Sequence, residues 1–307
     1  MRIVVSPYHL TTREAPAMAA LLLGERVVTL LPAPLEGNGD AKSAIAAAGR
    51  VPTYREFMKS WAWAEPLWRA GLIVGHVEGS TPARDMFDVA RRIGEDEALS
   101  PLREFSHERL YDDERHYLGA LAADLLKGGP DPGISVPLSA GLDRFAARHG
   151  MMVARASATS VAQKAEARLA SGMASVVVPI LLQASAERLL HAREVLRGAL
   201  AAVWAHAGGL DEDARGAWRG YAAAFDSARE EIFEDAREDD VRAVEGAATI
   251  TLMTLPGDAV LRSSLSALAM LSGGRRGGVS NPENLPTRFD PLDAAEVPAM
   301  VVKVLGR

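Results

Sequence analysis

The chain has 307 residues, of which 48% are hydrophobic and 24% are charged, the composition of a globular protein with one large domain or two smaller ones. Its formal net charge of −6 offers no basic field for nucleic acid or for an anionic membrane surface. The absence of Cys excludes disulfides, thiolate metal ligands and a cysteine nucleophile.

No run of 18 apolar residues is present, so we expect no membrane span. The apolar run at the start of the chain is too short for a signal peptide. Basic residues are mostly Arg, and the chain is rich in Ala, which is typical of a GC-rich genome. These features favour a cytoplasmic bacterial protein.

Short strands alternate with capped helices in the first third of the chain. Residues 3–5, 27–31 and 72–77 are β-branched or aliphatic runs bounded by turn residues, which predicts strands. The T-x-x-E patterns at 11–14 and 53–56 are capping boxes and predict helix starts. Strand–helix–strand order favours parallel pairing with right-handed crossovers.

The middle and the end of the chain mix helical and extended patterns. We predict helices at 83–94, 100–127, 139–148 and 159–171, a loop at 130–140, and strands at 151–156, 175–182, 248–255 and 300–305. Pro179 leaves a second interpretation of residues 175–182, as part of a kinked helix that continues into the next segment.

The clearest periodic signal predicts a long antiparallel helical hairpin at 185–245. Apolar residues recur at alternating steps of three and four in its two arms, 185–206 and 211–245, and a Gly-Gly pair separates the arms. The fold class is therefore a helix-rich α/β (or α+β) protein. We divide it into an α/β region at 1–130 and a helix-rich region at 131–307, with one continuous domain as the alternative.

The first candidate site lies at the carboxyl edge of the N-terminal sheet, where open α/β sheets bind ligands. Tyr8, His9 and Arg13 follow the first strand, and His76 and Glu78 follow the third. Together they would bind a carboxylate or a phosphate, with a histidine as acid or base. The alternative is that these residues form a turn and pack locally.

A second candidate is a metal site on the predicted helix at 100–127. Glu104 and His107 form an E-x-x-H pattern, and Glu114 lies toward the same edge of the apolar face. A solvated helix face with local ion pairs explains the same pattern. We therefore predict no cofactor.

Trp63 is a candidate for binding a protein partner. Four other aromatic residues form one helical stripe that we expect in the core: Tyr54, Phe57, Trp61 and Trp68. Trp63 points away from this stripe and, if exposed, would be a binding hot spot. Arg275 and Arg276, in a Gly-rich segment, offer two guanidinium groups for a partner or an anion.

These observations support three hypotheses for the function. The first is a non-catalytic interaction or assembly protein that binds a protein partner or forms a homo-oligomer. The second is an enzyme or small-molecule binder that recognises an anionic ligand at the carboxyl edge of the sheet. The third is a helical carboxylate/histidine metal protein. Binding of nucleic acid or of a membrane is not expected.

Overall fold

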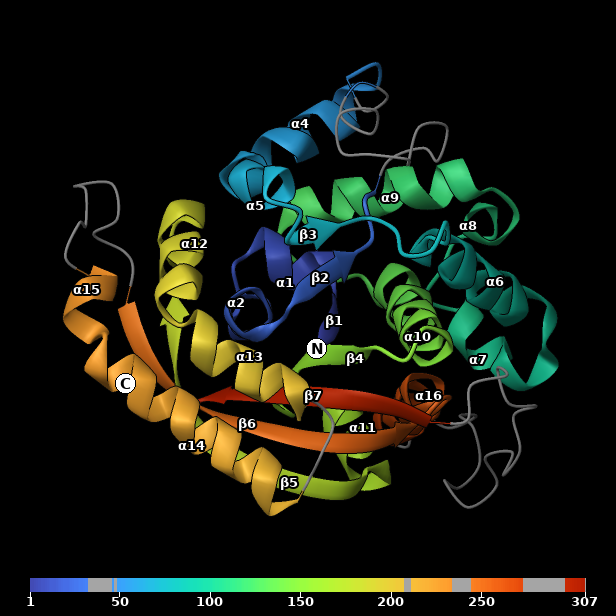
Figure 1. Cartoon of the computed structure of the whole chain (residues 1–307). Coiled ribbons are helices and arrows are strands. Elements are labelled where there is room, and N and C mark those ends of the chain that lie inside the picture. Colours follow the sequence, from blue (N-terminus) through green and yellow to red (C-terminus); the bar gives the residue numbers. More distant parts are fainter. Residues whose placement is uncertain (33–45, 47–48, 207–210, 234–243, 273–295, 307) are drawn as a thin grey trace.

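The computed structural model describes residues 1–32, 46, 49–206, 211–233, 244–272 and 296–306, and its centre is one mixed sheet (Figure 1). The strands of this sheet are β1 (Arg2–Val5), β2 (Arg26–Thr29), β3 (Ile73–Val74), β4 (Met152–Ala156), β5 (Ser171–Leu182), β6 (Val244–Pro256) and β7 (Glu296–Val304). Their order is β3-β2-β1-β4-β7-β6-β5.

The sheet has a parallel and an antiparallel part. Strands β3, β2, β1, β4 and β7 run parallel, and β6 and β5 continue the sheet in antiparallel pairing. From β1 the chain moves outward to β2 and β3, whereas β4 pairs with the other side of β1. The order of the strands therefore reverses between β1 and β4.

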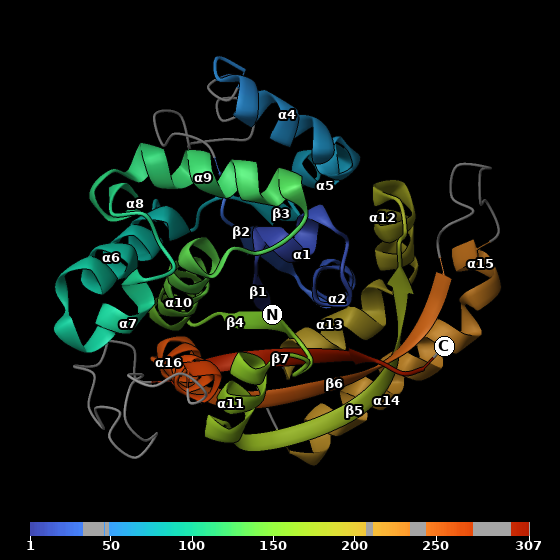
Figure 2. The ribbon, with the colours of Figure 1, turned by 180° about the vertical axis from the view of Figure 1, so that it is seen from behind.

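Helices cover both faces of the sheet. They are α1 (Pro7–Thr11), α2 (Ala15–Leu23), α4 (Pro52–Ser60), α5 (Glu65–Arg69), α6 (Pro82–Glu95), α7 (Ser100–Arg103), α8 (Arg109–Asp112), α9 (Glu114–Lys127), α10 (Pro132–Arg148), α11 (Val161–Leu169), α12 (Ala186–Val195), α13 (Arg197–Ala205), α14 (Glu212–Ser227), α15 (Arg229–Phe233) and α16 (Ala259–Ser272). In Figure 1, α13 and α14 lie in front of the sheet, and in the reverse view of Figure 2, α10, α11 and α16 lie in front of it.

Helix α2 lies at the centre of the packing. Its residues from Pro16 to Leu23 are all buried, because the helix is apolar on every side and contacts both the sheet and α12. The Arg193 Nη1 atom donates to the carbonyls of Leu21 and Leu22 at 2.9 and 3.0 Å. The indole of Trp204 donates to the Leu23 carbonyl at 2.7 Å. Side chains of α12 and α13 thus satisfy the carbonyls at the C-terminal end of α2.

The predicted α/β fold class is confirmed, and several boundaries are wrong. Both capping boxes are misplaced: Thr11 is the last residue of α1, and α2 starts after Glu14, which makes no side-chain cap. Likewise α4 starts at Pro52, before the predicted cap at Thr53. In each case a proline at the first helical turn sets the start of the helix instead.

The predicted helix at 100–127 is three helices, α7, α8 and α9, with breaks after Arg103 and Asp112. Its end is as predicted, since Gly128 adopts the left-handed conformation at the cap of α9. The predicted loop at 130–140 is wrong, because α10 begins at Pro132 with Asp131 as its N-cap and continues through Pro137.

Residues 175–182 belong to strand β5, which resolves the alternative that Pro179 left open. Proline is tolerated there because β5 is the last strand of the sheet. In the predicted hairpin segment, α13 packs on α14 and α12 contacts α15. The predicted range of 185–245 is too long, because β6 begins at Val244. The turn between the two arms of the hairpin, at 207–210, and residues 234–243 lie outside the described residues.

Within the described part of the chain, no helix combines the length and the apolar character that a bilayer crossing requires.

The aromatic stripe is largely in the core, since Tyr54, Phe57 and Trp61 are buried. Strands from both predicted regions, 1–130 and 131–307, take part in the same sheet.

Helices α6 and α10 approach closely at Gly141. A Cβ atom at this position would overlap the backbone of Met86 on α6. Gly216 and Gly220 of α14, whose four-residue spacing suggests a similar contact, have no neighbouring atom within 4 Å of such a Cβ. Of these glycines, only Gly141 is required by packing.

We predict that Gly141→Ala destabilises the protein by about 1–3 kcal/mol, because the added methyl group overpacks the α6–α10 contact. Gly216→Ala is the matched control and should stabilise the protein by about 0.5–1 kcal/mol, the difference between Ala and Gly within a helix. Urea denaturation of both variants measures these changes. Equal effects of the two substitutions would contradict the assigned packing.

Candidate functional site

A pocket of about 420 Å³ lies at the carboxyl ends of β1 and β4. Its walls come from the segment after β1, the loop between β4 and α11, and helices α10, α11 and α16. Since β1 and β4 are neighbours whose following segments diverge, the pocket occupies the point where the strand order reverses. Open α/β sheets bind ligands at such points, and this volume is typical of small-molecule sites.

The segment after β1 forms the first wall through α1 and a tight turn. The Ser6 hydroxyl accepts the Tyr8 amide at 3.3 Å, and Pro7 occupies the first turn of α1. The Thr11 hydroxyl donates to the Pro7 carbonyl at 2.8 Å, and the chain then turns at Arg13 with φ 51°. This path places His9 and Glu14 side by side.

His9 and Glu14 form a hydrogen-bonded pair in the pocket wall. His9 Nδ1 lies 2.8 Å from Glu14 Oε2, and the Thr12 hydroxyl donates to Glu14 Oε1 at 2.8 Å. The hydrogen bond with His9 lowers the pKa of Glu14, so this carboxylate is ionised at neutral pH.

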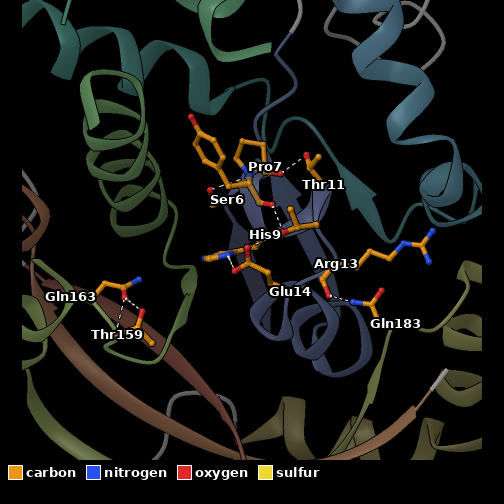
Figure 3. Close-up of polar contacts among 11 residues, drawn as sticks. Ser6, Pro7, His9, Thr11, Arg13, Glu14, Thr159, Gln163 and Gln183 are labelled. Atoms are coloured by element: carbon orange, nitrogen blue, oxygen red, sulfur yellow. Dashed lines mark hydrogen bonds and ion pairs between the residues drawn. The ribbon is translucent and has the colours of Figure 1, made fainter. Parts of the chain in front are cut away.

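The ionised carboxylate determines which nitrogen of His9 is available to a ligand. A carboxylate only accepts hydrogen bonds, which assigns a hydrogen to Nδ1; in the neutral imidazole the lone pair is then on Nε2. Figure 3 shows the His9 ring extending toward the wall that carries Thr159 and Gln163. His9 is therefore oriented as an acid–base group by its carboxylate partner.

The second wall is the start of α11, where Ser160 and Gln163 form a capping box. Gln163 Oε1 accepts hydrogen bonds from the Thr159 amide at 3.1 Å and the Thr159 hydroxyl at 2.9 Å (Figure 3). It also accepts from the Ser160 amide at 3.3 Å. Amides at a helix start commonly bind anions. Here the side chain of Gln163 accepts from two of the amides in this region, those of Thr159 and Ser160.

Arg155 of β4 joins two carboxylates beside this wall. Its Nη2 atom contacts Asp143 of α10, and its Nε atom lies 2.8 Å from Glu166 Oε1 of α11. Asp143 is fully buried, which raises its pKa to about 7, because Arg155 offsets only part of the desolvation cost and Glu166 adds a second negative charge. The three side chains connect β4, α10 and α11.

The third wall presents hydroxyl groups from α10 and α16. Ser135 and Ser139 are one helical turn apart on α10, and Ser264 lies on α16. Their hydroxyls make no hydrogen bond to the residues that the structure describes, so they are available to a ligand.

Tyr8 presents a neutral phenol to the same pocket. Its hydroxyl donates to Asp124 Oδ2 at 2.6 Å, and that oxygen also accepts the Asp131 amide at 2.8 Å. Burial and the hydrogen bond to Asp124 both raise the pKa of Tyr8. The phenol therefore keeps its proton at neutral pH and donates a hydrogen bond to Asp124.

Of the five residues predicted to bind a ligand together, Tyr8 and His9 line the pocket and Arg13 does not. The Arg13 guanidinium lies over the Trp63 ring, 4.5 Å from its centroid, and Gln183 Nε2 donates to the Arg13 carbonyl at 3.4 Å. Trp63, the predicted partner-binding residue, is half-buried in this contact, and its binding to a partner stays a prediction.

The prediction for Glu78 is also wrong. Strand β2 lies between β1 and β3, and the chain folds back after the two-residue β3. Glu78 pairs with Arg2 at 3.4 Å and with His149 at 3.7 Å. Arg2 is the first residue of β1 and His149 precedes β4, so both lie at the amino ends of these strands. His76 is half-buried and is not part of the pocket lining.

The three residues of the predicted metal site do not converge. Glu104 and His107 are exposed and lie in the break between α7 and α8, whereas Glu114 is in the first turn of α9. The single helix that would align them is therefore absent, and the described residues contain no group of three ligands suited to a metal. Arg275 and Arg276 lie outside the described residues.

Arg155 and Glu166 line the pocket and were not predicted from the sequence, nor was Asp143, the buried partner of Arg155. These three residues have no motif spacing. The S-x-x-Q pattern at 160–163 is a recognisable capping box directly after a predicted strand, and it is the one local signal that points to this wall.

No family model matches the chain, and comparisons with curated proteins and with solved structures give no match either. The site is therefore interpreted from its own geometry and chemistry.

We predict that Asp143 makes the protein less stable as the pH rises from about 5 to 7. Its native pKa of about 7 exceeds the value of about 4 expected in the unfolded chain, so the native state holds more protons in this range. The corresponding slope is at most about 1.4 kcal/mol per pH unit, and Asp143→Asn should remove it.

Chemical denaturation at pH 5, 6, 7 and 8 measures this slope. The control is Asp226→Asn on the exposed side of α14, which should keep the wild-type slope. If Asp143→Asn keeps it too, the buried carboxyl does not titrate in this range.

Proposed function

We propose that this protein binds a small molecule in the pocket between β1 and β4, and that His9 is the group that exchanges protons with it. The observation that carries the proposal is the position of the pocket at the reversal of the strand order, with a carboxylate-oriented histidine in its wall. Proton exchange that leads to turnover would make the protein an enzyme. Binding without turnover would make it a binding protein.

The supporting chemistry is the division of the pocket into different walls. His9 supplies an imidazole from the segment after β1, α10 and α16 supply hydroxyls, and α11 supplies an amide side chain at Gln163. Convergence of a few polar groups on an otherwise apolar concavity is typical of ligand sites. A cytoplasmic location and a bacterial source stay part of the proposal, on composition alone.

A pocket-blocking variant tests this function. Ala162 of α11 lines the pocket, and Ala162→Trp should fill it; Lys164→Trp, on the exposed side of the same helix, is the matched control. In a thermal-shift panel of sugars, amines, carboxylates and phosphates, at least one compound should raise the Tm of the wild type and of the control. At ten times its Kd, such a compound adds about 1.4 kcal/mol of stability.

The same compound should leave Ala162→Trp unchanged. Equal stabilisation of Ala162→Trp would place the binding elsewhere, and a panel without any stabilising compound would contradict a small-molecule function.

Self-association through β5 is the second candidate function, in keeping with the assembly role considered from the sequence. β5 is a 12-residue edge strand, and its Met173 and Val177 side chains are 61% and 55% exposed. Exposed edge strands are templates for pairing with another chain. The occupant of this edge would be the β5 strand of a second copy, related by a two-fold axis.

This candidate predicts a dimer by light scattering and a monomer for Val177→Lys, because a charge on the paired edge opposes association. Leu126→Lys, at an exposed position of α9, should stay dimeric. A monomeric wild-type protein would exclude the candidate.

A further inference from the structure

In the part of the pocket lining that the structure describes, the one Lys or Arg side chain is already paired. Among the described lining residues, Arg155 is the only Lys or Arg, and its guanidinium already contacts Asp143 and Glu166. Glu14 adds another carboxylate, which pairs with His9. A phosphate or carboxylate in the pocket would therefore compete with Glu166 for Arg155 and would lie near the Glu14 carboxylate.

Part of the helix start where an anion could bind is already taken by an uncharged side chain. The amides of Thr159 and Ser160, at the start of α11, both donate to Gln163 Oε1. The carbonyl oxygen of Gln163 takes the place of an anionic oxygen and is itself uncharged. An anion would gain these amides only by displacing that side chain.

The groups that are available to a ligand are neutral. The Ser135, Ser139 and Ser264 hydroxyls both donate and accept hydrogen bonds, and His9 Nε2 accepts one. Between these groups the pocket surface is apolar, formed in part by Leu142, Val153, Met253 and Leu255. Such a lining fits a molecule that carries several hydroxyls on a compact carbon skeleton.

We infer that the ligand of this pocket is a hydroxylated small molecule, such as a sugar or a polyol, that carries no negative charge. This inference rests on the proposed function and departs from the anionic ligand expected from the sequence. The difference arises because Arg13 lies against Trp63, outside the pocket, and Arg155 is held by two carboxylates.

Matched pairs of probes test the inference: ribose against ribose 5-phosphate, glycerol against glycerol 3-phosphate, and myo-inositol against its monophosphate. Ligand-observed NMR titrations of the full chain give the Kd of each compound. We expect at least one neutral compound to bind at least about tenfold more tightly than its phosphate, since the added charge is unfavourable in this lining.

The blocking variant separates failure of the inference from failure of the proposed function. If a phosphate binds more tightly than its neutral partner, and Ala162→Trp abolishes that binding, the inferred ligand class is wrong but the pocket is the binding site. If Ala162→Trp leaves all binding unchanged, the pocket itself is wrong. Absence of binding by every probe would overturn the ligand class.

Gln163→Ala tests the role of the two amides that Gln163 occupies. Without the amide side chain, the Thr159 and Ser160 amides become available, so the affinity for a phosphate should rise several-fold relative to its neutral partner. The neutral compound of each pair is the internal control. An unchanged ratio would contradict the role assigned to Gln163.

Discussion

The burial of helix α2 on all sides is the constraint on which the rest of the structure depends. An entirely apolar helix has no face for solvent, so it must be enclosed by the sheet and by the helices α12 and α13. Enclosure removes water from its last carbonyls, and Arg193 and Trp204 replace that water. Because α2 is fixed at this depth, the nine residues that connect it to β1 have one path, which brings His9 against Glu14 at the carboxyl edge of the sheet.

The opposite side of the pocket depends on a different buried interaction. Arg155 of β4 holds Asp143 of α10 and Glu166 of α11, so the strand and both helices are positioned by one guanidinium. A charged group of this kind is costly to bury without partners, and its removal leaves two carboxylates in a dry environment. The pocket therefore combines one wall fixed by apolar packing with another fixed by charge.

Local sequence patterns predicted the class of the fold and selected the segment after β1 for a candidate site, but they paired it with the end of the third strand instead of β4. Strand-forming runs and the cap at Gly128 are local signals, so they were predicted well. Prolines at positions 16 and 52 shifted two helix starts that the capping boxes had indicated, because Pro is favoured in the first helical turn. His9 was found because it directly follows β1. Glu78 was assigned to the wrong edge, since the insertion of β2 between β1 and β3 is a long-range property that no local pattern contains. Asp143, Arg155 and Glu166 meet for the same long-range reason.

A crystallographic fragment screen tests the central claim, that the reversal of strand order between β1 and β4 forms a ligand site, most directly. Soaking crystals with small neutral hydroxylated fragments should give electron density in the pocket, within hydrogen-bonding distance of His9 Nε2 and of the α10 hydroxyls of Ser135 or Ser139. Fragments that bind repeatedly at other surfaces, with only solvent between His9 and α10, would contradict the account.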